Sequence, residues 1–254
     1  MKSTKERNIG ILGAGSIGKL LARKLAQAGH NVKVANSRGP QTIEADTLEF
    51  GARAVEAAEA VKDVDVVILS IPFHRILDVA PLVAALPAET VIIDTGNYYP
   101  FRDTTIEPIE AGQVESVWVA KQLGRPIAKA WNSIVADSFA RKGTTKGTPN
   151  RIALPVAADR ETDRQVAMAL VEDTGFDGFD AGALADSWRQ QPGSPSYCTD
   201  LTAEELPSAL ASAEAARLPK RRDLAIEAIQ ERAGDSTTNL DAEYLVRLTR
   251  ALFM

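Results

Sequence analysis

The sequence predicts an α/β protein in which a doubly wound parallel sheet is followed by a smaller, mostly helical C-terminal region. Short continuous apolar runs alternate with longer amphipathic segments through the first half of the chain. Strands of a parallel sheet that is buried on both faces read this way, and helices connect them. A Gly-, Thr- and Pro-rich stretch at 141–150 then separates this half from a less regular remainder. We therefore expect a first domain over residues 1–145 and a smaller α/β-to-helical domain over 146–254.

Strands and helices are expected in alternation along the first hundred residues. Continuous apolar runs predict strands at 8–15, 30–37, 52–55, 65–72 and 90–97. Apolar residues at helical spacing predict helices at 16–29, 42–51, 57–64 and 75–87. Gly29 is a stop signal for the first helix, and Pro72 ends the fourth strand. This order is typical of a sheet with helices on both faces.

Beyond residue 100 the pattern is less regular. The segments 116–123 and 127–134 each fit a strand or a helix. We then expect a loop at 141–150, a strand at 151–159, a helix at 160–175 and an extended piece at 176–182. Pro192 and Pro195 prevent the segment 188–201 from forming one regular element. The last fifty or so residues, rich in Ala, Leu, Glu and Arg, predict two or three helices.

Composition narrows the class of protein. The 254 residues are 45% hydrophobic and 25% charged, as in soluble globular proteins, and the formal charge of −5 offers no basic surface for nucleic acid. A single cysteine excludes an intramolecular disulfide and fits a reducing compartment. The charged start "MKSTKERN" lacks the apolar core of a signal peptide, and no apolar run could span a membrane. We expect a cytoplasmic protein with no membrane or nucleic-acid partner.

A glycine motif follows the first strand. "GAGSIG" comprises Gly13, Ala14, Gly15, Ser16, Ile17 and Gly18 in the G-x-G-x-x-G spacing. The first glycine permits the tight turn, the second lets a pyrophosphate approach the backbone, and the third lets the helix pack on the strand. The helix N-terminus then presents N–H groups to the phosphates. The strand before the motif and the amphipathic helix after it favour a dinucleotide-binding Rossmann domain over a mere glycine-rich turn.

The stretch "ANSRGP" indicates which dinucleotide is bound. NAD-type sites carry an acidic residue about 20 positions after the glycines, where it binds the ribose 2′-hydroxyl. Here Asn36, Ser37 and Arg38 occupy that strand end, and no carboxylate is present to repel a 2′-phosphate. The planar guanidinium of Arg38 fits a phosphate, and the shorter side chains add donors. We expect NADP(H), unless Arg38 is only a solvated loop residue.

Together with "ILSIPFH", "VIIDTGNYY" and "IAKAWN", these motifs resemble the coenzyme F420-type NADP-dependent oxidoreductases. The resemblance covers about residues 8–182 and implies hydride transfer between NADP(H) and a deazaflavin. The same domain, on resemblance, also serves membrane metalloreductases that use a flavin. The implied second substrate is therefore F420, or FMN or FAD.

The resemblance also implies roles for individual residues. Ser37 and Arg38 would hold the 2′-phosphate, and Ile71 and Pro72 would border the cofactor, with His74 just beyond. The remaining residues, which would approach the nicotinamide, are Asn97, Lys129, Ala130 and Asn132. The segment "WRQQPGSPSYCTD" departs from the simplest members of the family.

Hydride transfer between flat rings needs positioning and a dry site, whereas a carbonyl or imine acceptor also needs a proton donor. The candidate donors are His74 and Lys129. The alternatives are a helix N-terminal residue without a chemical role for His74 and a solvated strand residue for Lys129. Two histidines and one cysteine make a zinc site improbable, so we expect no metal. His30 is expected to be structural, and Cys198 to be buried and inert.

Aromatic residues offer a surface for the second ring. Tyr98 and Tyr99 follow the Asn97 strand end and would either stack on a flavin-like ring or anchor the next element. Arg189 and Tyr197 of the segment 188–201 would line the same pocket, from this chain or a neighbouring subunit. The alternatives to a flavin-linked enzyme are a carbonyl or imine reductase and a non-catalytic NADP(H) sensor. Apolar positions in the C-terminal helices favour a homodimer.

Overall fold

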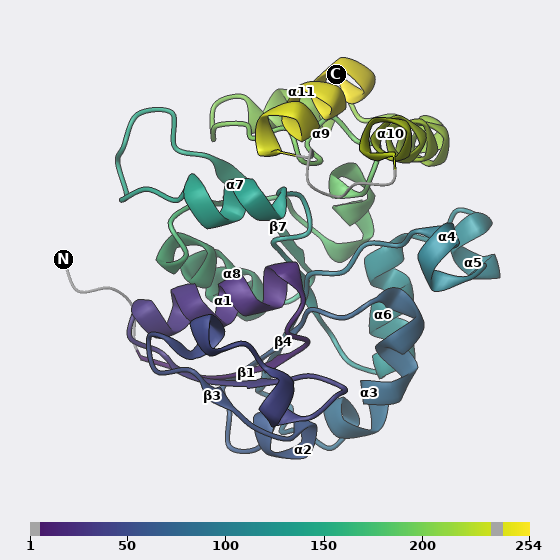
Figure 1. Cartoon of the computed structure of the whole chain (residues 1–254). Coiled ribbons are helices and arrows are strands. Elements are labelled where there is room, and N and C mark those ends of the chain that lie inside the picture. Colours follow the sequence, from purple (N-terminus) through teal and green to yellow (C-terminus); the bar gives the residue numbers. More distant parts are fainter. Residues whose placement is uncertain (1–5, 235–240) are drawn as a thin grey trace.

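A computed structural model describes residues 6–234 and 241–254 of the chain. Within these ranges one eight-stranded sheet runs through the molecule in the order β3-β2-β1-β4-β5-β6-β7-β8 (Figure 1). The strands are β1 (Asn8–Leu12), β2 (Asn31–Ala35), β3 (Arg53–Ala54), β4 (Val66–Leu69), β5 (Val91–Asp94), β6 (Ala128–Lys129), β7 (Ala153–Ala158) and β8 (Asp177–Asp180). Residues 1–5, part of the stretch in which we expect no signal peptide, lie outside the described residues.

The sheet confirms the predicted Rossmann-like α/β class with one correction. Strands β1 to β6 pair in parallel, and β7 and β8 also pair in parallel, but β7 runs antiparallel to β6. The connection from β6 stays at the carboxyl end of the sheet, so β7 starts there and runs back. The sheet is therefore mixed and not purely parallel as expected.

Helices cover both faces. Their bounds are α1 (Ser16–Gln27), α2 (Ala57–Ala60), α3 (Ile76–Ala84), α4 (Pro100–Asp103), α5 (Glu107–Glu110), α6 (Glu115–Leu123), α7 (Ala136–Arg141), α8 (Glu161–Asp173), α9 (Leu206–Ala211), α10 (Leu218–Ala233) and α11 (Ala242–Phe253). The predicted helix at 42–51 is instead a pair of 3₁₀ turns, Pro40–Thr42 and Ala45–Leu48. These turns are too short to build an i,i+4 ladder. Of the two ambiguous segments, the first is helix α6, and the second contains β6.

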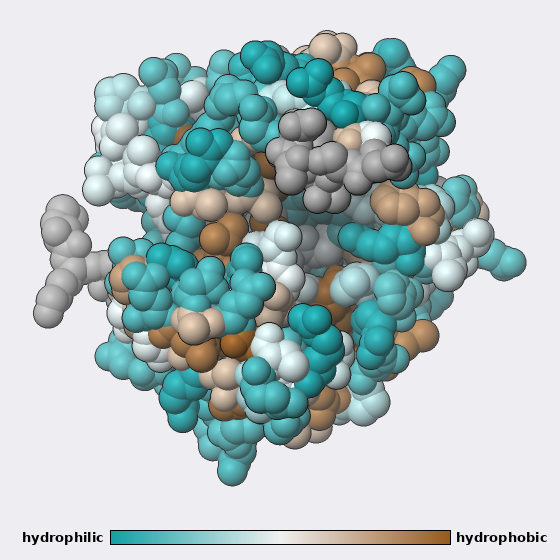
Figure 2. Space-filling view, viewed as in Figure 1, coloured by the Kyte–Doolittle hydropathy of each residue, from teal (hydrophilic) through white to brown (hydrophobic). Residues whose placement is uncertain are grey.

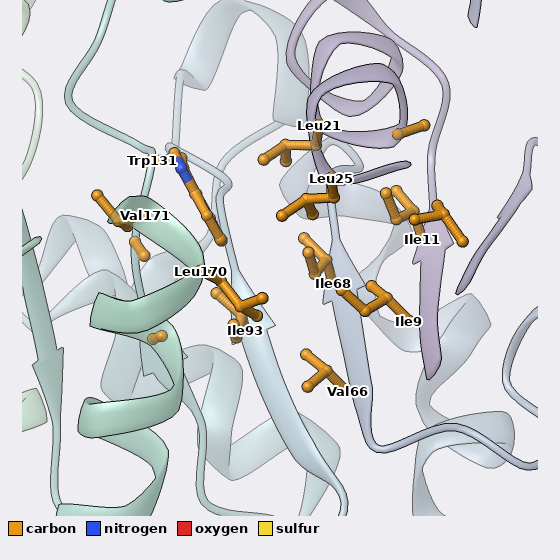
Figure 3. Packing of buried hydrophobic residues seen from close by; sticks show 14 of the residues in the cluster. Ile9, Ile11, Leu21, Leu25, Val66, Ile68, Ile93, Trp131, Leu170 and Val171 are labelled. Atoms are coloured by element: carbon orange, nitrogen blue, oxygen red, sulfur yellow. The ribbon is translucent and has the colours of Figure 1, made fainter. Parts of the chain in front are cut away.

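Alternation along the strands directs side chains into two cores. Ile9, Ile68 and Ile93 point to the face covered by α1 and α8, where Leu21 and Leu170 pack on them (Figure 3). Residues at the intervening positions, such as Val67 and Ile92, point to the face covered by α3 and α6. Each such side chain gains about 1.5–3 kcal/mol from burial. The two cores fix the strands whose carboxyl ends form the site described below.

The C-terminal helices α9, α10 and α11 gather at one side of the molecule (Figure 1). Helix α11 is joined to the irregular segment 188–201, because the hydroxyl of Thr249 donates to the carbonyl of Cys198 at 2.7 Å. Arg250 Nε likewise donates to the carbonyl of Thr199 at 2.7 Å. No helix in the described part of the chain has both the length and the apolarity to cross a membrane.

The division of the chain near residue 145 stays a prediction. Strands β7 and β8 extend the first sheet beyond that point. Limited proteolysis in the loop at 141–150, followed by separate unfolding of the fragments, would test this division.

Candidate active site at the carboxyl edge of the sheet

The predicted site residues follow the carboxyl ends of five strands. Strands β1 and β4 are neighbours although β2 and β3 lie between them in sequence, so the winding reverses there. Ligands of open α/β sheets bind at such a switch point. Gly13 follows β1, Asn36 follows β2, and Ile71 lies shortly after β4. Asn97 and Asn132 follow β5 and β6, so all five positions lie along one edge.

The glycine loop has the geometry that each glycine was expected to provide. Gly13 has φ +110°, and a Cβ there would lie 2.1 Å from the carbonyl oxygen of Ser70. A Cβ on Gly18 would lie 1.9 Å from the carbonyl oxygen of Gly13. A Cβ on Gly15 would meet nothing within 4 Å. Gly13 and Gly18 are thus required by the protein's own packing, whereas Gly15 leaves an open surface at the N-terminus of α1.

Next to this loop, Ala14 and Ile17 pack against the core beneath α1, and Ser16 is exposed as the first residue of that helix. The first turn of α1 contains no acidic side chain. Its N–H groups and the positive end of the helix dipole are therefore available to an anion.

The "NSR" turn presents donors beside the glycine loop. The side-chain oxygen of Asn36 accepts the N–H of Arg38 at 3.0 Å, and its amide nitrogen donates to Thr42 at 2.9 Å. Asn36 therefore shapes the turn and contacts a ligand less freely than its neighbours. Ser37 and Arg38 are exposed, and no described carboxylate pairs with the Arg38 guanidinium. This is the arrangement expected of a site for a 2′-phosphate.

A histidine–aspartate pair lies beyond β4. Ile71 and Pro72 are half-buried, and His74 follows them with its side chain 40% exposed. His74 Nδ1 lies 3.1 Å from Oδ1 of Asp103, which is fully buried. Burial acts to raise the pKa of Asp103, but hydrogen bonds from Arg102, the Tyr99 N–H and His74 lower it overall. An ionised Asp103 orients the ring and favours a proton on Nδ1.

Asn97 and Asn132 are brought together across β5 and β6. The amide of Asn132 donates to Oδ1 of Asn97 at 3.0 Å, and Asn97 Nδ2 donates to the Asn132 carbonyl at 2.9 Å. Gln190 completes the network, because its amide donates to Oδ1 of Asn132 at 2.9 Å. The network joins the strand ends to the irregular segment 188–201.

Tyr197 also reaches this network. Its hydroxyl accepts from Asn97 Nδ2 at 3.2 Å and lies 2.7 Å from the Tyr99 hydroxyl. Burial raises the pKa of both tyrosines, so both hydroxyls remain protonated. Tyr197 therefore lies where we expected, and it comes from this same chain. Arg189 does not contact this network. Its guanidinium instead stacks on Trp188 and donates to the carbonyl of Leu210.

Lys129 is buried below the site and is not solvated as the ordinary alternative assumed. Its Nζ lies 2.6 Å from Oδ2 of Asp94, bonds the carbonyl of Gly96 and lies 5.6 Å from the centre of the Phe73 ring. The register of β5 and β6 places Asp94 directly opposite Lys129. The ion pair therefore supports the loops after both strands, and the structure shows no exposed surface on the amine.

A strained turn follows β6. Trp131 has φ +55°, an unfavourable backbone conformation for a bulky residue, and its indole donates to Thr174 at 3.2 Å. Buried Ala130 precedes it. The turn carries the chain from the sheet to Asn132, so the strain is located where the site is assembled.

His30 and Cys198 both take the structural roles that the sequence predicted for them. His30 is buried with Nε2 3.1 Å from Asp173, a structural contact as expected. Cys198 is also buried, and burial raises the pKa of its thiol, which makes it a poor nucleophile. Sequence reasoning missed Asp103 and Gln190. Asp103 follows Tyr99 by four residues and accepts its backbone N–H, so a local contact near the predicted site could have indicated it. Nothing in the sequence links Gln190 to Asn132.

The edge as a whole combines an anion-binding end with a hydrogen-bonded end. Figure 2 shows the hydrophilic surface on this side, with apolar residues visible in the hollow across its middle. The first end provides backbone N–H groups and a cationic turn. The second provides amides, two neutral phenols and an oriented imidazole. Such a site can bind an extended anionic cofactor and hold a second molecule near its far end.

Comparison with known proteins finds a family of oxidoreductase domains in the first part of the chain. The family model described as "NADP oxidoreductase coenzyme F420-dependent" matches residues 8–98. The Escherichia coli (strain K12) protein YjhV is 46% identical over 78 residues, 29% of this chain and 57% of YjhV, so the match spans little more than half of that protein.

Two solved structures extend the comparison over most of the chain. Hypothetical protein SMa0349 of Sinorhizobium meliloti is 30% identical, with a TM-score of 0.63 over 77% of this chain and 93% of that one. The "putative f420 dependent nadp-reductase" of Arthrobacter sp. FB24 has the same fold, at 17% identity and a TM-score of 0.57 over 71% and 87% of the two chains. Residues 8–98 thus match the domain of coenzyme F420-dependent NADP oxidoreductases, and the chain as a whole belongs to the same family as SMa0349.

Proposed function

We propose that this protein binds NADP(H) and transfers a hydride between it and a second redox partner, a deazaflavin such as F420 or a flavin. One observation carries the cofactor assignment: the exposed guanidinium of Arg38 and hydroxyl of Ser37 occupy the strand end after β2 that an NAD-type site gives to a carboxylate. The family membership supports a redox reaction.

The cofactor fits the residues that are present. The open surface at Gly15 would receive the pyrophosphate, because a Cβ there would meet no protein atom. The N–H groups of the residues after it would bind the phosphate oxygens, and Ser37 and Arg38 would bind the 2′-phosphate. Ile71 and Pro72 would border the cofactor, and Asn97, Ala130 and Asn132 would lie toward the nicotinamide. Bound NADPH supplies the hydride.

The chain's own contribution to this reaction is positioning. The Asn97–Asn132–Gln190 network fixes the loops after β5 and β6 relative to the segment 188–201. The buried Lys129–Asp94 pair holds the same loops from below. Rigid loops favour a close approach of the two rings, and such positioning is what a hydride transfer between them requires of the protein.

The histidine–aspartate pair favours a second candidate, an NADPH-dependent carbonyl or imine reductase. Such an acceptor needs a proton when the hydride arrives. His74 has the required exposure and is oriented by Asp103, and the protonated Tyr99 and Tyr197 lie at the same edge. Lys129 is buried in its ion pair, so in this candidate we assign the donor role to His74.

A screen of acceptors tests both candidates. NADPH oxidation is followed with F420, FMN, FAD and a panel of carbonyl and cyclic imine compounds, for the wild type and His74→Gln. Turnover of F420 or a flavin that is unchanged in the variant supports the first candidate. Turnover of a carbonyl or imine that falls about 10²–10⁴-fold in the variant supports the second. NADPH binding without oxidation by any acceptor would overturn both.

Two broader expectations belong with this proposal. We propose a cytoplasmic homodimer, as the composition and the apolar C-terminal helices suggest. Light scattering of the purified full chain would measure the oligomeric state, and a monomeric mass at micromolar concentration would overturn the dimer.

A further inference from the structure

A cavity of about 220 Å³ lies beside the proposed site, under the C-terminal helices. Tyr99 and Tyr197 form one end of its wall, and residues of α10 and α11 form the other, including Ala225, Ile229 and Leu245. Most of this lining is apolar. The proposed hydride transfer does not use the cavity, although the two tyrosines belong to both sites.

The wall also contains a buried cation. Arg222, on α10, is 7% exposed and lines the cavity. Its Nε donates to Asp223 at 2.8 Å, and its guanidinium lies 5.7 Å from the centre of the Tyr98 ring. Among the described residues, no hydrogen bond is made by its two terminal nitrogens. The exposed carboxylate of Asp223 forms an ion pair with Nε, so the two terminal nitrogens keep donors for an acceptor inside the cavity.

We infer that this cavity binds a small monocarboxylate with a compact apolar body, and that Arg222 pairs with the carboxylate. The two terminal nitrogens of a guanidinium can hold one carboxylate in a planar, two-point contact. A phosphate dianion would bring a second negative charge to a guanidinium that already has Asp223 as a partner, which is less favourable among apolar side chains. The ligand class follows from one guanidinium with unused donors in a wall that is mostly apolar.

The volume limits the size of the apolar body. An engineered apolar cavity of about 150 Å³ in another protein is large enough for benzene, whereas pockets for drug-sized ligands begin near about 300 Å³. A volume of about 220 Å³ lies between these limits. A six-membered ring or a branched chain of similar size fits, and a complete flavin or deazaflavin does not. This ligand site is therefore separate from the proposed ring-to-ring hydride transfer.

Calorimetric titration of the full chain with benzoate, benzamide and acetate tests the inference. Benzamide lacks the charge, and acetate lacks the apolar body. We expect benzoate to bind at least about tenfold more tightly than either, because a charge-assisted pair and a filled cavity each contribute about one decade or more. Equal binding of benzoate and benzamide, or no benzoate binding, would overturn the proposal.

Three variants locate the site. Arg222→Gln is expected to weaken benzoate about tenfold or more and leave benzamide unchanged. Ala225→Leu fills the cavity and is expected to weaken both. Lys220→Gln removes a positive charge from an exposed position on the same helix and is the matched control, with no expected change.

NADPH titrations of the same proteins measure the cofactor site separately. Benzoate binding therefore tests the carboxylate site whether or not the hydride-transfer proposal is correct. Benzoate affinity that is the same in the wild type, Arg222→Gln and Ala225→Leu would place the carboxylate elsewhere and end the proposal.

Discussion

The two ends of the carboxyl edge are built in opposite ways. The phosphate end consists of two contiguous stretches, residues 13–18 and 36–38, whose donors are backbone N–H groups and exposed side chains of residues close together in sequence. The far end consists of Asn97, Asn132 and Tyr197, held together by partly buried hydrogen bonds between distant segments. The phosphate end therefore depends mainly on local conformation, whereas the far end depends on tertiary packing. Variants that change only one of these two properties test this difference.

The largest effect is expected at the far end, from Lys129→Met. The substitution leaves the carboxylate of Asp94 buried without its cation, and breaking such a pair costs about 3–5 kcal/mol. Urea unfolding would measure the loss. Replacing both residues, as in Asp94→Leu with Lys129→Met, is expected to cost much less. A single variant as stable as the wild type would show that the pair does not support these loops.

The next effect concerns the phosphate end, where Gly18→Ala and Gly15→Ala form a matched pair. The Cβ on residue 18 would meet the carbonyl of Gly13, so we expect a loss of about 1–3 kcal/mol in the free energy of unfolding. The Cβ on residue 15 meets no protein atom, so stability is kept and only NADPH binding weakens. Equal destabilisation by both substitutions would mean that residue 15 is also packed by the protein.

A smaller, pH-dependent effect is expected from Glu115→Gln. Burial raises the pKa of Glu115 from 4.5 to about 7, despite the opposing charge of Lys129 and the Tyr98 N–H. Since the unfolded carboxyl ionises first as pH rises, the folded state loses stability across this window. The Gln variant lacks this loss, so its stability relative to the wild type should rise by about 2 kcal/mol between those pH values. A pH-independent difference would show that Glu115 titrates normally.

The same contrast explains how much could be predicted from sequence. The glycine motif and "NSR" could be read because their residues are neighbours in the chain and their roles follow from local geometry. The alternation of strands and helices was recovered for the same reason, since periodicity is local. By contrast, the antiparallel pairing of β7 with β6 is a contact between distant segments, which no local pattern encodes.

Long-range contacts account for the remaining differences. For Lys129 the ordinary alternative to a proton donor was a solvated strand residue, because nothing near it in sequence shows that Asp94, from the neighbouring strand, lies opposite. Asn97 and Tyr197 are a hundred residues apart, so only the fold shows that they share a hydrogen bond. Arg189 and Tyr197 looked equivalent in an irregular segment, and packing alone separates them. The positive φ of Trp131 likewise has no signal in the sequence.

The affinities of Arg38→Ala for NADPH and NADH test the central claim most directly, namely that the turn after β2 recognises a 2′-phosphate. Arg38 is exposed, so stability should not change. Loss of a charge-assisted contact is expected to weaken NADPH about ten- to a hundredfold and to leave NADH within about twofold. Ser37→Asp should act in the same direction, because its carboxylate repels the phosphate. Equal losses for NADPH and NADH would contradict the account and leave the stretch as a turn without a ligand.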